Sequence, residues 1–393
     1  MKKLMIVGAS VLQLPAILKA KEMGLHVAVV DFNPQAVGIP YADEYYNAST
    51  MDEDAVLAAA EAYKPDGIMT LATDMPMRGV AKTSDKLHLH SINYATAVKA
   101  TDKYDMIKAF KEHGVPSPWF FVADTLEELE AHEQELTFPC IIKPTDNAGS
   151  HGVAKVFSFQ ELIDNYEYAH SCSRHGKVIV EEYLDGPEVS VEVMVVNGEV
   201  NILQITDKIT TEAPHFVEMG HTQPSRLPGD VQKAIRNVTE AACKAIGIDK
   251  GPAHVEMKVT KRGPVMIELG ARMGGDNITT HLVPLSTGID MVGSTIKVAL
   301  GEEPDIEPTL HCGSAIRYFE VPFGTIKSIE NVEHAQQVPG VKQITFTKNV
   351  GEESTPIHCS NDRIGFVIAQ GATAEDAVKA CEEAMKVINV VIA

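Results

Sequence analysis

Apolar and polar residues alternate in two different periods along the first hundred positions of the chain. Short apolar runs bounded by turn residues predict buried strands, and stretches with apolar residues at helical spacing predict amphipathic helices. The predicted elements are strands at 3–8, 26–31 and 67–73 and helices at 12–23, 52–63 and 77–84. Strands that alternate with helices in this way are typical of a parallel sheet.

Two turns of this region are candidates for ligand contacts. After Gly8 in the first turn the next glycine is Gly24, so the G-x-G-x-x-G fingerprint of nicotinamide dinucleotide binding is absent. The polar loop at residues 73–76 follows a predicted strand, at the edge where open α/β sheets bind ligands. Both a substrate-binding loop and an ordinary polar loop fit that pattern.

A lysine and a glycine-rich loop are the first candidates for phosphate binding. Residues 138–144 predict a strand that ends at Lys143, and the loop at 145–153 contains Ser150 and Gly152. Backbone amides of such a loop, together with an ammonium group, can surround phosphate oxygens. No Gly-Lys-Ser/Thr sequence opens a helix here, so the loop is not a Walker A motif, and a flexible hairpin loop is the alternative.

Two other stretches suit a nucleotide. The helix predicted at 102–113 has Lys103 in its first turn, where a cation is unfavourable unless an anion lies nearby. Residues 181–184 end a further predicted strand in a mixed polar and apolar run, which can present backbone groups to an adenine edge. An Asn197-Gly198 pair then predicts a type I′ turn between two more strands, and a helix is predicted at 231–246.

A β-hairpin near residue 262 carries the most informative pattern. Its strands read VEMKVT and PVMIELG, and Gly263 ends the loop, where a three-residue turn needs a residue that tolerates positive φ. In that register Glu256 lies opposite Glu268, and Arg272 follows in a glycine-rich turn. The same register predicts a wholly apolar opposite face made of Val255, Met257, Val259, Val265, Ile267 and Leu269.

Two opposed carboxylates repel each other, and a divalent cation between them removes the conflict. With an arginine nearby, such a pair is a phosphate-handling arrangement. The alternative is a half-exposed hairpin with two solvated glutamates. His254 precedes the pair on the same face and is a weaker candidate, because a packed or exposed histidine fits equally well.

Composition narrows the function classes. The chain of 393 residues has a formal net charge of −20 and no basic stripe, which argues against binding a nucleic-acid backbone. Its six cysteines are scattered without a C-x-x-C motif and are expected to be reduced. Neither a signal-peptide pattern nor an 18-residue apolar stretch is present, so a cytoplasmic protein without membrane contact is expected.

These motifs, in this order over about 200 residues, resemble the ATP-grasp superfamily of carboxylate ligases. The resemblance implies an α/β and α+β architecture, with an ATP-grasp fold between an N-terminal parallel α/β (pre-ATP-grasp) domain and a C-terminal α+β lobe. The implied domains are residues 1–96, 97–305 with a lid at about 120–184, and 306–393.

The resemblance also implies ligands and residue roles. ATP would be the phosphoryl donor, with Mg²⁺, or Mn²⁺ in its place, held by Glu256 and Glu268. Arg272 would stabilise the transferring phosphoryl group and the acyl phosphate. Lys143 would act in catalysis and contact the ATP phosphates. The other implied nucleotide contacts are Lys103, Ser150, Gly152, Glu181, Glu182, Tyr183, Leu184 and, at the ribose, Glu188.

One position departs from the family pattern. Many members have an asparagine two residues after the second metal carboxylate, whereas this chain has Gly270 there. The form Glu-x-x-Ala-Arg-x-x-Gly resembles the branch that contains bacterial L-amino-acid ligases. This departure leaves open how a second Mg²⁺ is held.

The resemblance implies an ADP-forming ligase that activates a small carboxylate as an acyl phosphate for attack by an amine. The acid and amine are small molecules of unassigned identity, and a homodimer is expected from family habit. Two alternatives stay open at this point: an enzyme that activates bicarbonate, as biotin carboxylases and carbamoyl phosphate synthases do, and an ATP-binding sensor without turnover.

Overall fold

The N-terminal residues form a parallel sheet, as the alternating pattern predicts. The computed structural model describes residues 1–146, 152–213 and 215–393. The sheet has the order β3-β2-β1-β4 and is parallel throughout. Its strands are β1 (Lys3–Val7), β2 (His26–Asp31), β3 (Glu44–Asn47) and β4 (Gly67–Met69). The helices of this region are α1 (Leu14–Glu22), η1 (Ile39–Tyr41), α2 (Glu53–Tyr63) and α3 (Met77–Leu87).

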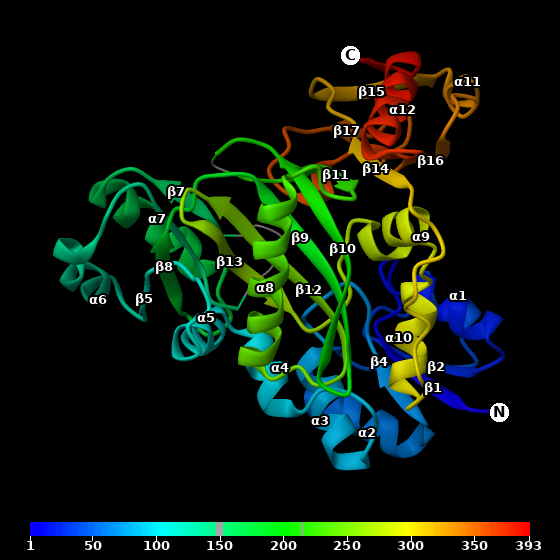
Figure 1. Cartoon of the computed structure of the whole chain (residues 1–393), viewed down its shortest axis with the longest axis horizontal. Helices are drawn as coiled ribbons and strands as arrows, with labels where there is room; N and C mark the ends of the chain where they lie inside the picture. The colour runs from blue at the N-terminus through cyan, green and yellow to red at the C-terminus, as the bar shows by residue number, and fades with distance from the viewer. Residues whose placement is uncertain (147–151, 214) are drawn as a thin grey trace.

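A helix from much later in the chain completes the N-terminal core. α10 (Met291–Ala299) lies beside α1 and contributes Met291 and Ile296 to the same apolar cluster (Figure 1). The approach is close, because a Cβ added at Gly67 on β4 would lie 2.4 Å from the carbonyl oxygen of Ala299. The parallel sheet is therefore fixed against the rest of the molecule.

The acidic residue that ends β2 has a structural partner. One carboxylate oxygen of Asp31 accepts a hydrogen bond from the amide of Ala9 at 2.8 Å, and the other accepts from the amide of Asn33 at 2.9 Å. Asp31 thus ties the turn after β1 to the end of β2. This use of the carboxylate agrees with the absence of a dinucleotide fingerprint.

A second, antiparallel sheet projects from the molecule (Figure 1, far from both termini). Its order is β5-β8-β6-β7. The strands are β5 (Phe120–Ala123), β6 (Cys140–Pro144), β7 (Ala154–Val156) and β8 (Val178–Glu182). The helices of this part of the chain are α4 (Tyr94–Thr101), α5 (Lys103–Glu112), α6 (Leu126–Ala131), η2 (Glu133–Glu135) and α7 (Phe159–Ser171). β7 ends at Val156, and Ser158 then caps α7, which begins at Phe159.

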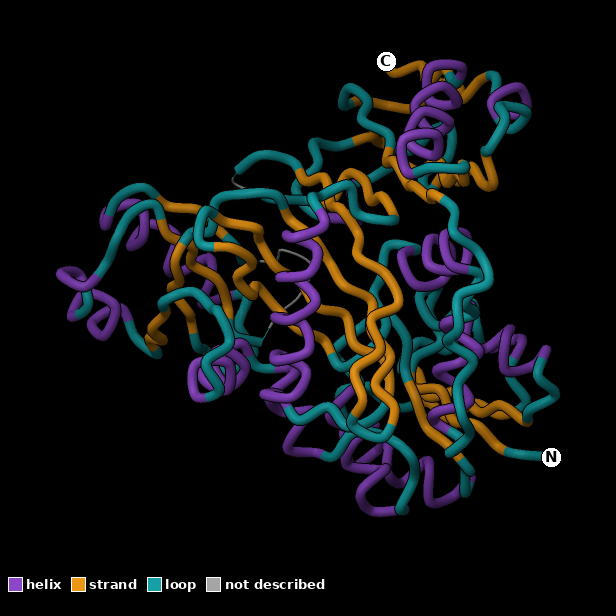
Figure 2. The backbone as a smooth tube through the Cα atoms, viewed as in Figure 1, coloured by secondary structure: helices purple, strands orange, loops and turns teal. Residues whose placement is uncertain are grey.

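The largest sheet is antiparallel and has the order β13-β12-β9-β10-β11-β14-β18-β16. Its first five strands are β9 (Glu188–Val196), β10 (Glu199–Thr210), β11 (Glu218–Gln223), β12 (Gly251–Thr260) and β13 (Gly263–Gly270). α8 (Gly229–Ile246) crosses one face, as Figure 2 shows, and buries its apolar side in the cluster that holds Val191 and Val255. The predicted turn between β9 and β10 is confirmed, since Asn197 and Gly198 both have positive φ.

The β12–β13 hairpin keeps the predicted pairing only at its inner end. Glu256 lies opposite Glu268, as predicted, but a bulge follows and Met257 pairs with Met266. The loop therefore has two residues rather than three, with Thr260 opposite Gly263. The bulge moves Met266 into the core.

The prediction of an unbroken apolar face was therefore wrong toward the loop. Met257 now shares its face with Met266, and Val265 pairs with Lys258 on the opposite one. Ile267, the unpaired bulge residue, lines a cavity instead of the core. An extra residue in one strand reverses the side to which the side chains beyond it point, here those between the bulge and the loop.

The last residues extend the large sheet and cover it. β14 (Gly313–Tyr318) pairs directly with β11, so the sheet is continuous across residue 306. The remaining strands are β15 (Gly324–Glu330), β16 (Val341–Phe346), β17 (Glu353–Ser354), β18 (Gly365–Gly371) and β19 (Asn389–Ile392), and the helical elements are η3 (Ile278–Leu282), α9 (Val283–Thr287), α11 (Val332–Ala335), η4 (Ser360–Asp362) and α12 (Ala374–Val387). Across the described residues, no helix combines the length and apolarity needed to span a bilayer.

Candidate active site

A cavity of about 370 Å³ lies where the projecting sheet, the large sheet and the N-terminal loops meet. Its wall includes residues from β6, β8, β9, β10, β11, β12 and β13, and Ser360 from the C-terminal region. Ten of the twelve predicted site residues line it: Lys103, Lys143, Glu181, Glu182, Tyr183, Leu184, Glu188, Glu256, Glu268 and Arg272. Segments far apart in the sequence therefore converge on one cavity.

The two remaining predicted residues belong to the glycine-rich loop. Ser150 lies outside the described residues. Gly152 is described and has a φ of +79°, and a Cβ added there would lie 2.7 Å from the Cβ of Cys172. Gly152 thus packs tightly against Cys172 at the end of α7, and the next residue, Val153, lines the cavity.

Lys143 and Glu181 form a buried ion pair on neighbouring strands. β6 pairs with β8 so that Ile141 lies opposite Glu181. Lys143 is two residues after Ile141, so its side chain lies on the same face of the sheet and contacts the Glu181 carboxylate. Only 6% of the Lys143 side chain and 8% of the Glu181 side chain is exposed. Glu181 therefore positions the Lys143 ammonium, and its own contact with a nucleotide stays a prediction.

The end of β8 leaves backbone groups available at the cavity. The amide of Glu182 donates to the carbonyl of Trp119 at 3.0 Å, and the Glu182 carboxylate accepts from Arg262 at 2.8 Å. Within the part of the chain that the structure describes, the amides of Tyr183 and Leu184 form no hydrogen bond. Those two amides are free to contact a ligand such as the edge of a base.

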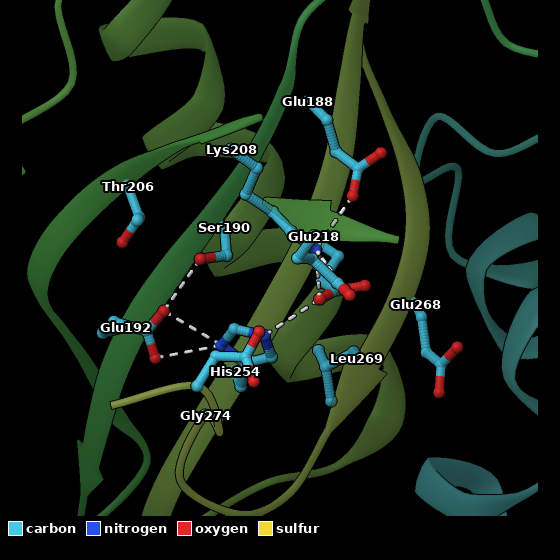
Figure 3. A network of polar contacts seen from close by, with 12 residues as sticks. Glu188, Ser190, Glu192, Thr206, Lys208, Glu218, His254, Glu268, Leu269 and Gly274 are labelled. Carbon is cyan, nitrogen blue, oxygen red and sulfur yellow. Dashed lines mark hydrogen bonds and ion pairs between the residues drawn. The ribbon is translucent and has the colours of Figure 1, made fainter. Parts of the chain in front are cut away.

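Lys208 connects three carboxylates in the cavity (Figure 3). Its Nζ lies 2.8 Å from Glu188 Oε1, 2.8 Å from Glu256 Oε1 and 3.5 Å from Glu218 Oε1. Burial opposes the charge of Lys208, but the three carboxylates outweigh burial and raise its pKa well above the usual range. Lys208 and His254 in turn hold the pKa of Glu256 well below its usual range, against the effect of burial. Glu256 is therefore an anion.

His254 links two glutamates in the same network (Figure 3). Its Nδ1 lies 2.9 Å from Glu192 Oε1, and its Nε2 lies 3.0 Å from Glu256 Oε1. Burial favours neutral imidazole, but the charge of Glu192 and the hydrogen bonds to both carboxylates raise the pKa of His254 to about 9. A Cβ added at Gly274 would lie 2.6 Å from His254 Nδ1, so a glycine is required beside this pair. The histidine is buried and acts as a clamp between the glutamates.

The raised pKa of His254 predicts how stability depends on pH. Because this pKa of about 9 exceeds that of an unfolded histidine, its contribution is complete below about pH 6.5 and is lost as pH rises through 9. We expect the metal-free, nucleotide-free protein to lose up to about 3 kcal/mol of unfolding free energy over this window. Urea unfolding in EDTA at several pH values measures this loss. A His254→Gln variant with an equally steep loss would contradict the assignment.

Glu268 and Arg272 have cation and anion partners from other elements. Lys103, the first residue of α5, places its Nζ 3.2 Å from Glu268 Oε2. The Arg272 guanidinium contacts Asp74 with both ends, Nε to Oδ1 at 2.9 Å and Nη2 to Oδ2 at 2.7 Å. Burial disfavours the charge of Arg272, but Asp74 outweighs it and raises the pKa. The polar loop at residues 73–76 therefore reaches the site through Asp74.

Comparison with known families gives two matches. Residues 136–281 match the model of the ATP-grasp domain, and residues 317–393 match that of the L-amino acid ligase C-terminal domain 2. The first match spans the Lys143 strand, the Glu181–Leu184 segment and the hairpin with its two glutamates.

The chain contains an ATP-grasp domain.

Relatives agree with this assignment. An uncharacterized protein of Sinorhizobium fredii is 30% identical over 70% of this chain and 58% of its own length. The alanine–anticapsin ligase of Bacillus subtilis is 28% identical over 64% of this chain and 58% of its own length. The chain thus spans little more than half of these relatives. The crystal structure of an L-amino acid ligase from Bacillus licheniformis has a TM-score of 0.86 at 24% identity, covering 100% of this chain and 99% of that one.

The predicted fold class is thereby confirmed: the ATP-grasp fold follows an N-terminal parallel sheet.

In the described part of the chain, no three histidine, cysteine, aspartate or glutamate side chains lie close enough to hold a metal ion alone. Mg²⁺ is commonly held by one or two carboxylates together with the phosphates of the substrate. The opposed glutamates 256 and 268 fit that use, and nucleotide oxygens would then supply further ligands.

The glycine at position 270, where many ATP-grasp members have an asparagine, lies against an ion pair. A Cβ added at Gly270 would lie 2.8 Å from Asp74 Oδ1 and 2.9 Å from Arg272 Cζ. The Asp74–Arg272 ion pair thus occupies the space that an asparagine side chain would need. A larger residue at position 270 would therefore have to displace one of these two side-chain ends, and the glycine leaves room for the ion pair.

Sequence reasoning missed several charged residues of the cavity. Lys208 and Glu218 lie on β10 and β11, and His221 follows on β11, a strand that was not predicted. Asp276 accepts from Arg363 at 2.7 and 2.8 Å and lies 3.3 Å from His221 Nε2. In the sequence, these positions are distinguished only as polar residues in strands that contain both polar and apolar residues. Their partners lie tens of residues away, which the sequence pattern does not reveal.

Proposed function

We propose that this ATP-grasp protein is an ADP-forming ligase that joins a small carboxylic acid to an amine. One observation carries the proposal: the opposed Glu256–Glu268 pair shares a cavity with Arg272, two lysines and the free backbone amides at the end of β8. This set suits ATP with its metal at one end and an acyl phosphate at the other. Because the relatives are longer than the matched segment, the activity of the whole chain is part of this proposal.

The residues divide the work as follows. Glu256 and Glu268 would hold Mg²⁺, which would neutralise charge on the phosphate oxygens that the carboxylate must approach. Lys103 and Lys143 add positive charge in the cavity, and the carboxylates of Glu268 and Glu181 hold their ammonium groups in place. Arg272 places its guanidinium beside the transferring phosphoryl group. The negative charge that it stabilises on the phosphoryl oxygens develops fully only as the acyl phosphate forms. The amine then attacks the activated carbonyl, and inorganic phosphate leaves.

The ligands proposed are amino acids. Support comes from the match to an L-amino acid ligase C-terminal domain and from the similarity to the alanine–anticapsin ligase. In this chain, the partly exposed Glu218 carboxylate lines the cavity and can attract an ammonium group. A homodimer stays a prediction.

A coupled assay tests the activity directly. ATP and Mg²⁺ are incubated with a panel of amino acids, singly and in pairs, and the release of ADP and phosphate is measured beside a bicarbonate arm. We expect phosphate release to need both an acid and an amine, because the acyl phosphate is consumed by the amine. Release with bicarbonate alone would favour a carboxylase. The absence of turnover with every acid, while ATP still binds, would favour a sensor.

A further inference from the structure

A second cavity lies next to the candidate active site. It has a volume of about 240 Å³ and shares Asp74, Lys103 and Glu268 with the wall of the first cavity. Its other walls come from α3 and α4, through Arg78 and Thr101, and from the segment after α7, through Arg174. Asp74, Lys103 and Glu268 thus lie between the two cavities, and the first cavity holds the predicted nucleotide contacts.

The four carboxylates of the second cavity already have partners. Asp74 binds Arg272, and Glu268 lies 3.2 Å from Lys103. Asp146 lies 2.7 Å from His175 Nδ1 and also accepts from the amides of Arg174 and His175. Glu53 accepts from the Tyr94 hydroxyl at 3.1 Å and lies 3.6 Å from Lys82 Nζ. None of these carboxylates is left to neutralise a further cation.

Two guanidinium groups in the same wall have only neutral partners. Arg78 Nε donates to the Thr101 hydroxyl at 2.7 Å, and Arg174 Nη2 contacts the sulfur of Met75. Across residues 1–146, 152–213 and 215–393, neither arginine lies in an ion pair. The stretch 147–151 reads Asn-Ala-Gly-Ser-His, and residue 214 is proline, so the rest of the chain contains no acid that could pair with them.

The arginines are also held in place. Asp146 accepts hydrogen bonds from the Arg174 amide at 3.1 Å and from the Ser173 hydroxyl at 3.1 Å. These hydrogen bonds fix the position of the Arg174 backbone. Arg78 lies within α3 and is half-buried. Guanidinium groups bind carboxylates and phosphates through paired, charge-assisted hydrogen bonds. Two of them facing a cavity smaller than the roughly 300–1,000 Å³ of typical ligand pockets suit a small oxyanion.

We propose that the second cavity is a separate binding site for a small oxyanion, either inorganic phosphate or the carboxylate of a small acid. Its position against Lys103 and Glu268 places the anion beside the phosphate end of the active site. The inference rests on the proposed function only for the source of the anion, which is either the phosphate released by the ligase reaction or the acid that enters it. Binding itself requires no turnover.

Calorimetric titration tests this site. The protein is first saturated with Mg²⁺ and a non-hydrolysable ATP analogue, so that the first cavity is filled. Inorganic phosphate and acetate are then titrated in separate arms. We expect saturable binding of at least one anion. Arg78→Met and Arg174→Met should each weaken it at least about 10-fold, because each removes a charged donor.

An exposed arginine on α8, Arg236, provides the matched control, since it lines neither cavity. Arg236→Met should leave anion affinity unchanged. Arg174 is itself exposed, so its variant keeps the test available if Arg78→Met fails to fold. Tighter binding of phosphate assigns the site to the released product, and tighter binding of acetate assigns it to the substrate acid.

Three results would overturn the proposal. The first is that neither anion binds while the ATP analogue fills the first cavity. The second is unchanged affinity in both cavity variants. The third is an equal loss in Arg236→Met, which would indicate a general charge effect. None of these results bears on ligase turnover, and an inactive protein that still binds the anion would contradict the proposed function alone.

Discussion

Replacing Glu268 with glutamine is expected to lower ATP turnover about 100-fold or more while the protein remains folded. Glutamine keeps the size of the side chain and can still accept a hydrogen bond from Lys103, which now lies 3.2 Å from Glu268 Oε2. It removes the negative charge that faces Glu256 across the hairpin and that we propose holds Mg²⁺. The measurement is the rate of ADP release, with circular dichroism and thermal unfolding as checks of the fold.

The matched control for this variant is Glu199→Gln, at an exposed position on β10 outside the cavity. It should turn over ATP at the normal rate. A second readout is the Mg²⁺ concentration at half-maximal activity, which should rise in Glu268→Gln and stay constant in the control. Near-normal activity of Glu268→Gln at low Mg²⁺ would show that the metal is not held by this carboxylate.

Replacing Arg272 with methionine is expected to abolish formation of the ligated product and to spare the binding of ATP. The guanidinium is proposed to stabilise charge that appears only as the phosphoryl group moves, and loss of such a donor typically costs about 100- to 1,000-fold in rate. Product formation is measured by mass spectrometry, and nucleotide affinity by titration with a fluorescent ATP analogue. A variant that loses nucleotide affinity and ligates normally at saturating ATP would show that Arg272 has another role.

The structure adds a complication, because Arg272 also neutralises Asp74 through two hydrogen bonds. Removal of the arginine alone leaves a carboxylate facing the phosphate end of the cavity without its partner. The double variant Asp74→Asn/Arg272→Met removes both charges. If ATP affinity falls in the single variant and returns in the double one, the loss came from the unpaired Asp74. Ligation should stay absent in both.

The sequence predicted the central part of the site and its surroundings to different extents. The opposition of Glu256 and Glu268 could be predicted because a hairpin with alternating residues has few registers, and both strands carry the charge at the same depth. The bulge after Glu256 could not, because Val265, Met266 and Ile267 are all apolar and any one of them could face the core. Apolar residues in succession carry no signal for which one leaves the ladder.

The charged partners were less predictable than the charged candidates. Lys208 lies 48 positions before Glu256, and Arg363 lies 87 positions after Asp276, yet each pair is in contact. Such pairs depend on how strands β10 and β12 flank β9 and on where the C-terminal region returns to the sheet. Local periodicity holds no information on either point. The strength of the family resemblance therefore came from the order of motifs, whereas the pairing of charges required the fold.

The pairing of β11 with β14 makes the C-terminal region inseparable from the cavity. β11 carries Glu218 and His221, and its far side is satisfied only by residues 314–317. Without them, this strand would present a row of unpaired amides and carbonyls to solvent, the arrangement that promotes association between chains. Exchange of the C-terminal region for that of a related protein is therefore expected to reshape this wall of the cavity. The strand that lines the proposed substrate cavity thus depends on the C-terminal region for a paired edge.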